Sequence, residues 1–358
     1  MRVLTVITRR KLLAQTGRAA ALWPLSPMHT SDAATQKPAA SAAVGFRPLR
    51  FPRDHGAHPN HRIEWWYLTA WLDPNTGLQA TIFRTSLGKA RPSHWGSNQW
   101  LIGHAALIRR DWPKLIHEQT AWRCVESVAE FSTADLELKL PGWRMQRASD
   151  DRIAIDLSQG RLAMQLQCHP IAAPELQGQR GYSQKGPEAS QFSHYYSRTQ
   201  LRIDAQVEVD GKPLAIEKAS PFAVAWFDHE WSDSLLASQA AGWDWFGLNL
   251  LDGSSWMAFR IRNRQAGDLW HSESGLLLET LQSWRSPSSG ARYPVVLRVQ
   301  SKRGSLILRA LVPDQEIDAR ASTGNRYWEG AVTAHSEQGE LIGRGYLELT
   351  GYDKPMRL

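Results

Sequence analysis

The stretch Glu64-Trp65-Trp66-Tyr67-Leu68-Thr69-Ala70-Trp71 consists mostly of residues that favour β-strands. A turn signal follows at Asp73-Pro74-Asn75-Thr76-Gly77, and a second strand-forming run follows at Gln79-Ala80-Thr81-Ile82-Phe83-Arg84. Two such runs joined by a turn predict a β-hairpin.

Aromatic side chains are predicted on both faces of the first strand of this hairpin. Side chains alternate along a strand, so Trp66 and Leu68 face one side while Trp65 and Tyr67 face the other. We therefore expect one face to pack in a core and the other to line a cavity.

Glu64 is a carboxylate at the start of this apolar strand. A buried charge without a partner is costly, and Arg84 on the second strand is a candidate partner. We favour a structural ion pair inside a barrel, and the alternative is a catalytic acid.

The strand pattern recurs along the chain, and strong helix patterns are scarce. Many short antiparallel strands with even turn spacing are typical of barrels or sandwiches. The 358 residues suffice for two domains of ordinary size, so we predict an all-β fold with two barrel-like halves. Further strands are predicted at 104–108, 136–140, 153–157, 162–168, 201–209, 245–250, 256–262, 295–299, 306–308, 327–332 and 345–352.

Three parts are predicted along the chain. Residues 1–45 form an export leader and a flexible tether, residues 46–232 an N-terminal barrel domain, and residues 233–358 a C-terminal barrel domain. The tether follows from the Ala, Ser, Thr, Gln and Pro content of residues 31–44.

The leader contains the twin-arginine pattern Thr8-Arg9-Arg10-Lys11-Leu12-Leu13, followed by an apolar run at 19–23. Such a leader is an export address, so we expect a periplasmic or secreted protein; a chance Arg-Arg pair is the alternative. The apolar run is short and is followed by Pro24 and Pro27, and no transmembrane segment is predicted in the mature chain.

Composition excludes several functional classes. The hydrophobic content of 42% allows a real core, and the 17 tryptophans indicate aromatic-lined cavities or sheets faced with aromatic side chains. The net charge is +7, but Lys and Arg are scattered, so no nucleic-acid binding is predicted. A nucleophile elbow, a phosphate-binding loop and a dinucleotide fingerprint are all missing, and no cofactor is predicted. Cys124 and Cys168 allow at most one disulfide, and whether they pair is left open.

Two further stretches gather the chemistry of the chain: Ala225-Trp226-Phe227-Asp228-His229-Glu230-Trp231-Ser232 and Gly242-Trp243-Asp244-Trp245-Phe246-Gly247. As a strand, the first places Phe227, His229 and Trp231 on one face, and Asp228 and Glu230 on the other.

A carboxylic acid against indole rings has a raised pKa and can donate a proton, and indole faces stabilise a developing cation. These are the needs of acid-catalysed addition to an alkene, or of its isomerisation. We predict that Asp228 orients His229, that His229 handles water or a proton, and that Asp244 is the acid. Trp231 and Trp243 are expected to wall the cationic centre.

Structural interpretations of the same residues stay open. His229 also fits a core histidine fixed by Asp228, and the tryptophans also fit ordinary barrel packing. After the long connection at 170–193, Tyr195 and Tyr196 fit either a pocket lining with hydroxyl donors or simple packing.

The loop at 51–61 holds three histidines with spacings that metal ligands also show: His55, His58 and His61. No regular element fixes them, so we interpret them as solvated or hydrogen-bonding side chains and predict no metal site.

Several motifs together resemble the AttH-like, carotenoid 1,2-hydratase-related family, with the likeness running from about Phe46 to the C-terminus. This resemblance implies two tandem lipocalin-like β-barrel domains with a pocket near their junction. The motifs are Glu64-Trp65-Trp66-Tyr67, Gln177-Gly178, Gly181-Tyr182-Ser183, Tyr195-Tyr196-Ser197, Asp228-His229-Glu230-Trp231 and Gly242-Trp243-Asp244-Trp245-Phe246-Gly247.

Carotenoid hydratases add water to a terminal double bond without a cofactor, and their His-Xaa-Trp motif is matched by His229 and Trp231. Their Tyr-Xaa-Asp pair is not reproduced at the expected place, so Asp244 or Asp228 takes the proton donor's role in this prediction. The resemblance thus implies a hydratase or isomerase of a carotenoid-like or terpenoid-like alkene. The ligand-binding residues expected are Trp243, Trp245, Trp66, Tyr195, Tyr196 and Glu64.

Two other functions stay open. Many bacterial relatives look like companions of an ABC transporter, which implies a non-catalytic carrier of a lipid or another apolar ligand. The tryptophan content also fits a carbohydrate-binding module.

Overall fold

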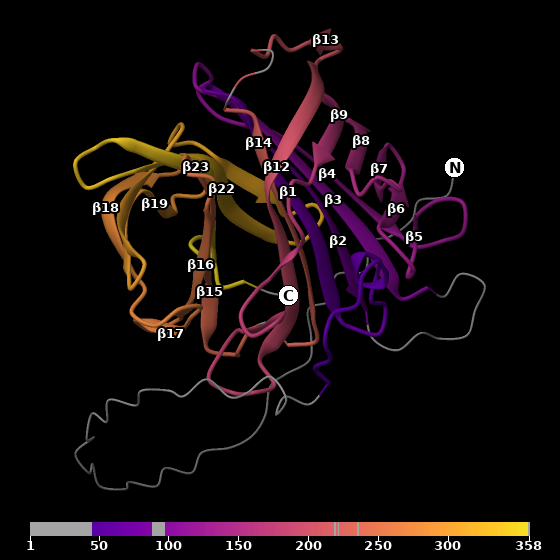
Figure 1. Ribbon diagram of the computed structural model, residues 1–358, viewed down its shortest axis with the longest axis horizontal. Coiled ribbons are helices and arrows are strands. Elements are labelled where there is room, and N and C mark those ends of the chain that lie inside the picture. The colour runs from indigo at the N-terminus through magenta and orange to yellow at the C-terminus, as the bar shows by residue number, and fades with distance from the viewer. Residues whose placement is uncertain (1–44, 88–96, 218–219, 221, 235, 357–358) are drawn as a thin grey trace, which may run out of the picture. The chain divides into compact units, whose positions relative to one another are not determined.

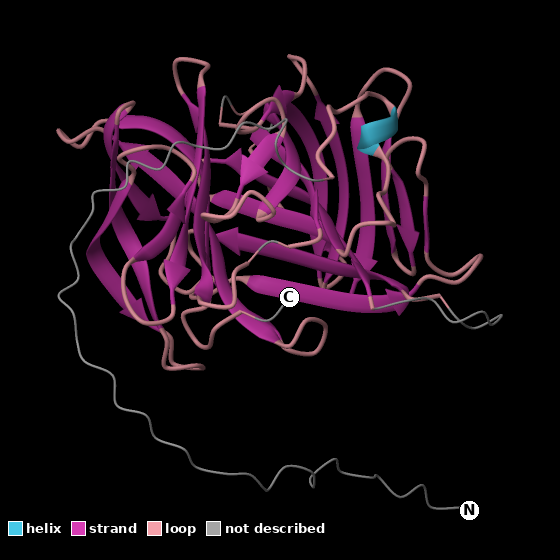
Figure 2. Ribbon diagram, turned by 90° about the horizontal axis from the view of Figure 1, so that it is seen from below, coloured by secondary structure: helices cyan, strands magenta, loops and turns pink. Residues whose placement is uncertain are grey.

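The computed structural model describes residues 45–87, 97–217, 220, 222–234 and 236–356. The predicted leader and tether lie outside these residues, except for Gly45. Figure 2 shows strands throughout and one short helical turn, η2 (Arg53–His55). In the described part of the chain, no helix has the length and apolarity that a membrane crossing requires. The all-β prediction is confirmed.

The first half of the chain forms one large antiparallel sheet. Among the described residues this sheet has 14 strands. The strands are β1 (Ile63–Asp73), β2 (Thr76–Ser86), β3 (Gln99–Arg109), β4 (Ile116–Arg123), β5 (Glu130–Phe131), β6 (Glu137–Leu140), β7 (Trp143–Arg147), β8 (Ile153–Gln159), β9 (Leu162–His169), β10 (Glu175–Leu176), β11 (Tyr182–Gln184), β12 (Phe192–Val209), β13 (Lys212–Pro213) and β14 (Val224–Ser232). Their main order is β4-β3-β2-β1-β14-β12-β9-β8-β7-β6-β5, and β10, β11 and β13 also pair with β12.

The second half forms a sheet of 9 described strands. They are β15 (Ala240–Leu250), β16 (Ser255–Asn263), β17 (Asp268–His271), β18 (Leu277–Arg285), β19 (Arg292–Ser301), β20 (Gly304–Ala310), β21 (Glu316–Ala319), β22 (Asn325–His335) and β23 (Leu341–Thr350). The order is β17-β16-β15-β23-β22-β20-β19-β18, with β21 paired to β22. Both sheets curl, as the lipocalin-like fold requires, and Figure 1 shows the second, in orange and yellow, beside the first.

The predicted hairpins form in the predicted places. β1 pairs with β2, and Glu64 lies directly opposite Arg84. β8 pairs with β9, β15 with β16, and β19 with β20. The chain passes from the first sheet to the second between Ser232 and Ala240.

Three large hydrophobic cores form among the described residues, beside a small cluster around Tyr182. The first lies on the inner face of the first sheet and includes Trp66 and Trp231. The second sheet encloses another, which includes Phe246 and Leu347. A further core lies between the two sheets, where Tyr67 of β1 meets side chains of the second sheet. Strands at the junction are therefore buried on both faces, which explains why the sequence carries aromatic residues on both.

Gly247 permits close packing of two indoles at this junction. A Cβ at this position would lie 2.6 Å from the Trp245 ring and 3.1 Å from the Trp226 ring. Without it, Trp226 and Trp245 meet edge to face with centroids 6.3 Å apart.

Both cysteines are free thiols. Cys168 is buried in the first core, and Cys124 is partly buried at its edge. Burial raises the pKa of the Cys124 thiol to about 12, so this group stays protonated at neutral pH.

Candidate functional site

A cavity of about 500 Å³ lies between the two sheets. Its walls come from β1, β2, β3 and β14 of the first sheet and from β15, β16, β22 and β23 of the second. Most of its lining is apolar and aromatic, as is typical of a small-molecule pocket. The aromatic side chains in the wall are Trp65, Tyr67, Phe83, Trp100, Tyr195, Trp243, Trp245, Phe259 and Tyr327.

Four carboxyl groups line this apolar cavity. Asp228 and Glu230 come from β14 of the first sheet. Glu329 of β22 and Glu348 of β23 come from the second. Carboxyl groups in so apolar a place must be paired or protonated, so the hydrogen bonds of each one define its chemistry.

Asp228 is held by three hydrogen-bond donors. Its Oδ2 accepts from the Tyr195 hydroxyl at 2.7 Å, and its Oδ1 accepts from the Ser197 hydroxyl at 2.5 Å and from Trp226 Nε1 at 2.7 Å. Burial raises the pKa of Asp228 to about 7, against the opposing effect of these donors. Near neutral pH this group can therefore either give or take a proton.

Glu230 is paired with a buried lysine. Lys185 Nζ lies 2.7 Å from Glu230 Oε1, and the same oxygen accepts a short hydrogen bond from the Ser193 hydroxyl. The ammonium also lies over the Phe259 ring at 3.9 Å and the Tyr195 ring at 4.9 Å. Lys185 follows β11 within the long connection, and nothing in its local sequence marks it as a cavity residue.

Glu329 and Glu348 are directly opposite each other on neighbouring strands. Burial, followed by the charge of Glu348, raises the pKa of Glu329 well above its ordinary value. Burial also raises the pKa of Glu348 to about 7, although Trp243 Nε1 donates to its Oε2 at 2.8 Å. Sequence reasoning missed both acids. The available signal was alternation, which puts them on the same faces as Tyr327 and Tyr346.

The cavity also has an imidazole in its wall. His104 Nδ1 lies 2.8 Å from the Tyr327 hydroxyl, and its Nε2 lies 2.8 Å from the Ser322 hydroxyl. Burial lowers the pKa of His104 to about 3, so it is a neutral hydrogen-bonding group at this end of the site.

His229 lies on the opposite face of β14 and points into the first core. Its Nε2 lies 2.9 Å from Glu64 Oε1, and its Nδ1 lies 3.3 Å from the Tyr196 hydroxyl. Burial lowers its pKa to about 4, although the Glu64 hydrogen bond opposes this. The prediction that Asp228 orients His229 is wrong, because neighbouring residues on a strand point to opposite faces.

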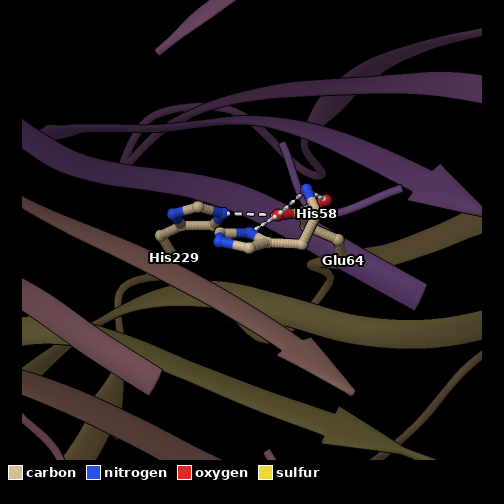
Figure 3. A group of neighbouring side chains, drawn as sticks. All are labelled: His58, Glu64 and His229. Carbon is tan, nitrogen blue, oxygen red and sulfur yellow. Dashed lines mark hydrogen bonds and ion pairs between the residues drawn. The ribbon is translucent and has the colours of Figure 1, made fainter. Parts of the chain in front are cut away.

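Glu64 is the centre of a buried polar network, drawn in Figure 3 with His58 and His229. His58 Nδ1 lies 2.6 Å from Glu64 Oε1, and Arg84 Nε lies 2.7 Å from Glu64 Oε2. Asp54 Oδ1 lies 3.2 Å from His58 Nε2. Burial disfavours ionisation of Glu64, but the hydrogen bonds from His229 and His58 outweigh it and hold its pKa well below its usual range. The structural ion pair of Glu64 with Arg84 is confirmed.

His58, Glu64 and His229 carry nitrogen and oxygen atoms within 4.8 Å of one another, a spacing that a metal ion also uses. Their facing atoms already bond to each other, and Arg84 holds the second oxygen of Glu64. A metal ion would have to break these bonds beside a guanidinium, so the geometry favours a structural network.

Trp231 belongs to the same core and does not line the cavity. Its ring stacks on His58 with centroids 3.7 Å apart and on His194 with centroids 5.1 Å apart. Trp66 stacks on His229 with centroids 4.6 Å apart.

Asp244 faces the interior of the second sheet. Its carboxylate is 2.7 Å from Arg260 Nη2 and 2.9 Å from Arg262 Nε, and it accepts from the Tyr352 hydroxyl at 3.1 Å. Two guanidinium groups already occupy this carboxylate, and it does not line the cavity. The assignment of Asp244 as the acid therefore does not fit the structure.

The cavity thus brings together four of the ten predicted site residues: Asp228, Tyr195, Trp243 and Trp245. The other six point into the two flanking cores: His229, Trp231, Trp66, Tyr196, Glu64 and Asp244.

Comparisons with known proteins agree with this fold. The family described as AttH-like matches residues 42–352. A solved structure from Nitrosomonas europaea, assigned to AttH, is 36% identical with a TM-score of 0.78, and the match covers 87% of this chain and 99% of that one. Kievitone hydratase from Nectria haematococca is 14% identical with a TM-score of 0.58, covering 89% of this chain and 97% of that one. At that identity the likeness shows a shared fold. None of the curated proteins matches.

The AttH match spans both sheets and the cavity between them. The Nitrosomonas europaea protein shares this two-sheet architecture over nearly its whole length. This chain belongs to the AttH-like family.

Proposed function

We propose that this protein binds an apolar small molecule with a carbon–carbon double bond in the cavity between its sheets. There it catalyses addition of water to that bond, or its isomerisation, by acid catalysis without a cofactor. One observation carries the proposal: carboxyl groups with raised pKa values line an aromatic cavity, among them Asp228 and Glu348 at about 7.

The chemistry needs only protons and water. A carboxyl proton moves to one alkene carbon, whose new C–H bond takes the π-electron pair, and the other carbon becomes cationic. The indole faces of Trp65, Trp243 and Trp245 stabilise this cation, each by about 0.5–2 kcal/mol. Water then bonds to the cation and gives up a proton. Asp228, held in place by its three donors, is the acceptor for that proton.

The fold supports this reaction class. Kievitone hydratase shares the fold, and its name attributes a hydration to it. The proposal extends that class of reaction, and not that substrate, to this chain. The cavity volume of about 500 Å³ is within the range of pockets for drug-sized ligands, so a terpenoid of about fifteen carbons is a suitable probe.

Asp228 and His229 give a matched pair of variants, because these neighbours on β14 face opposite sides of the sheet. With farnesol as probe, Asp228→Asn is expected to reduce formation of the hydrated or isomerised product about 10²–10⁴-fold. His229→Gln is expected to retain turnover per folded molecule, because His229 does not reach the cavity. Product formation is followed by mass spectrometry, and folding by circular dichroism.

Loss of turnover in His229→Gln but not in Asp228→Asn would contradict this assignment. Binding is measured separately by tryptophan quenching with farnesol, fatty acids and oligosaccharides. Binding of apolar ligands without product in the parent protein would favour the carrier. Quenching by oligosaccharides alone would favour a carbohydrate-binding module.

We propose in addition that the protein is exported through its twin-arginine leader and works beside an ABC transporter. The leader pattern at residues 8–13 supports export. Cell fractionation of the full chain and of an Arg9→Lys, Arg10→Lys variant tests the first point. Co-purification with transporter subunits tests the second.

A further inference from the structure

We propose that Glu329 and Glu348 form a carboxyl pair that holds one shared proton at the cavity wall and delivers it to the bound alkene. The inference rests on the proposed function and names the proton donor, which that function leaves open. The two residues belong to the second sheet, across the cavity from Asp228.

The register of the sheet brings the two acids together. Glu329 of β22 and Glu348 of β23 are directly opposite partners, and opposite side chains on a strand pair have Cβ atoms about 4.5–5.5 Å apart. Two carboxylates at that distance in an apolar site cannot both be charged without a large penalty. One proton shared by the pair removes this repulsion.

The surroundings of the two carboxyl groups differ, and the difference says which one keeps the proton. Trp243 Nε1 donates to Glu348 Oε2 and so stabilises a negative charge there. Glu329 is 3% exposed and its Oε1 has no donor in good hydrogen-bond geometry, although the neutral Tyr67 hydroxyl interacts with this carboxyl group and opposes the effect of burial. A buried oxygen without a donor favours the protonated acid, so Glu329 carries the proton and Glu348 is the carboxylate.

The other groups around the pair supply no competing positive charge. Tyr67 of β1 and Tyr327 and Tyr346 of the second sheet are neutral phenols whose pKa values are raised by burial. Asp228 and Glu230 on β14 act through their charge to raise the pKa of Glu348. The one described lysine of the cavity wall is Lys185, and Glu230 already pairs with it.

The proton balance of the step is simple. The Glu329 O–H bond breaks as the alkene C–H bond forms, and the O–H electron pair stays on the carboxyl group. After water adds to the cation, the proton released goes to Asp228 and returns to the pair through solvent. Alkene and water are consumed, alcohol is formed, and no electron acceptor is required.

The first experiment uses farnesol in D₂O and follows deuterium in the carbon skeleton, which reports proton transfer itself. Glu329→Gln is expected to reduce incorporation at least 100-fold with farnesol affinity unchanged. Glu340→Gln is the matched control, because Glu340 is exposed beside β23, and it should behave as the parent. Parent-like incorporation in Glu329→Gln, with loss in Asp228→Asn, overturns the pair while the proposed function stands. A parent protein that binds farnesol and related alkenes but incorporates no deuterium overturns both.

The second experiment tests the shared proton without turnover. The fluorescence of Trp243 is measured as the difference between the parent and Trp243→Phe. It should change with a midpoint near pH 7, because Trp243 donates to Glu348, whose pKa is about 7. In Glu329→Gln this midpoint is expected to move to higher pH, since Glu348 no longer competes with a second carboxyl group for the proton and its carboxylate loses the hydrogen bond from the Glu329 acid. An unchanged midpoint in Glu329→Gln means that the two groups do not share a proton, and it overturns the inference.

Discussion

Replacing Glu64 by alanine is expected to lower the free energy of unfolding by about 3–5 kcal/mol, the cost of breaking a buried ion pair from one side. Arg84 is fully buried, and Glu64 Oε2 accepts from its Nε at 2.7 Å. The same substitution removes the carboxylate that faces His58 and His229. Urea unfolding followed by circular dichroism measures the change.

Two control variants test whether the loss of stability comes from the buried ion pair. Glu137→Ala breaks an exposed ion pair with Arg144 and should cost less than about 1 kcal/mol. The double variant Glu64→Met, Arg84→Met should be more stable than Glu64→Ala alone, because no buried guanidinium is left unpaired. If Glu64→Ala is within about 1 kcal/mol of the parent, the network does not stabilise the first core in the way the contacts indicate.

Asp228 is expected to make the parent protein lose stability as the pH rises, relative to Asp228→Asn. Burial raises the pKa of Asp228 in the folded state from 3.8 to about 7. Between these values the folded protein binds a proton that the unfolded chain releases, so the contribution is complete below about pH 4 and lost as the pH rises through about 7. The unfolding free energy of the parent minus that of Asp228→Asn should fall by about 4 kcal/mol across this range.

Asp54 is a control whose contribution to stability has the opposite dependence on pH. Burial disfavours its charged form, but hydrogen bonds from Arg47 and His58 lower its pKa well below 3.8. Its contribution to stability is therefore present above about pH 4 and lost as the pH falls. Denaturant unfolding of the parent, Asp228→Asn and Asp54→Asn at several pH values measures both trends. If the unfolding free energy of the parent minus that of Asp228→Asn stays constant or rises with pH, Asp228 is ionised in the folded protein.

Much of the fold follows from local pattern alone. Strand runs and turn signals predict the hairpins, and their spacing places Glu64 opposite Arg84. The period of two also separates Asp228 and Glu230 from His229 and Trp231. The resemblance to the AttH-like family adds the pocket at the junction of the two halves, and the cavity between the sheets confirms it.

The sequence alone does not show which face of a strand lines the cavity. β14 is buried on both sides, so its sequence carries no amphipathic signal to show which side meets a ligand. The first core fills one side with the His229 network, and the second sheet forms the cavity on the other. For the same reason Trp243 and Trp245 line the cavity while Asp244, between them, does not.

The sequence by itself determined the predicted hairpins and the residues that share each face, because these depend on contacts between chain neighbours, but β4 and β18 were not among the predicted strands. The tertiary structure alone decided which face became a site. Glu329 and Glu348 meet through the register of β22 and β23, and Lys185 reaches the cavity from a long connection. Such encounters depend on how distant segments pack, and no local periodicity encodes them.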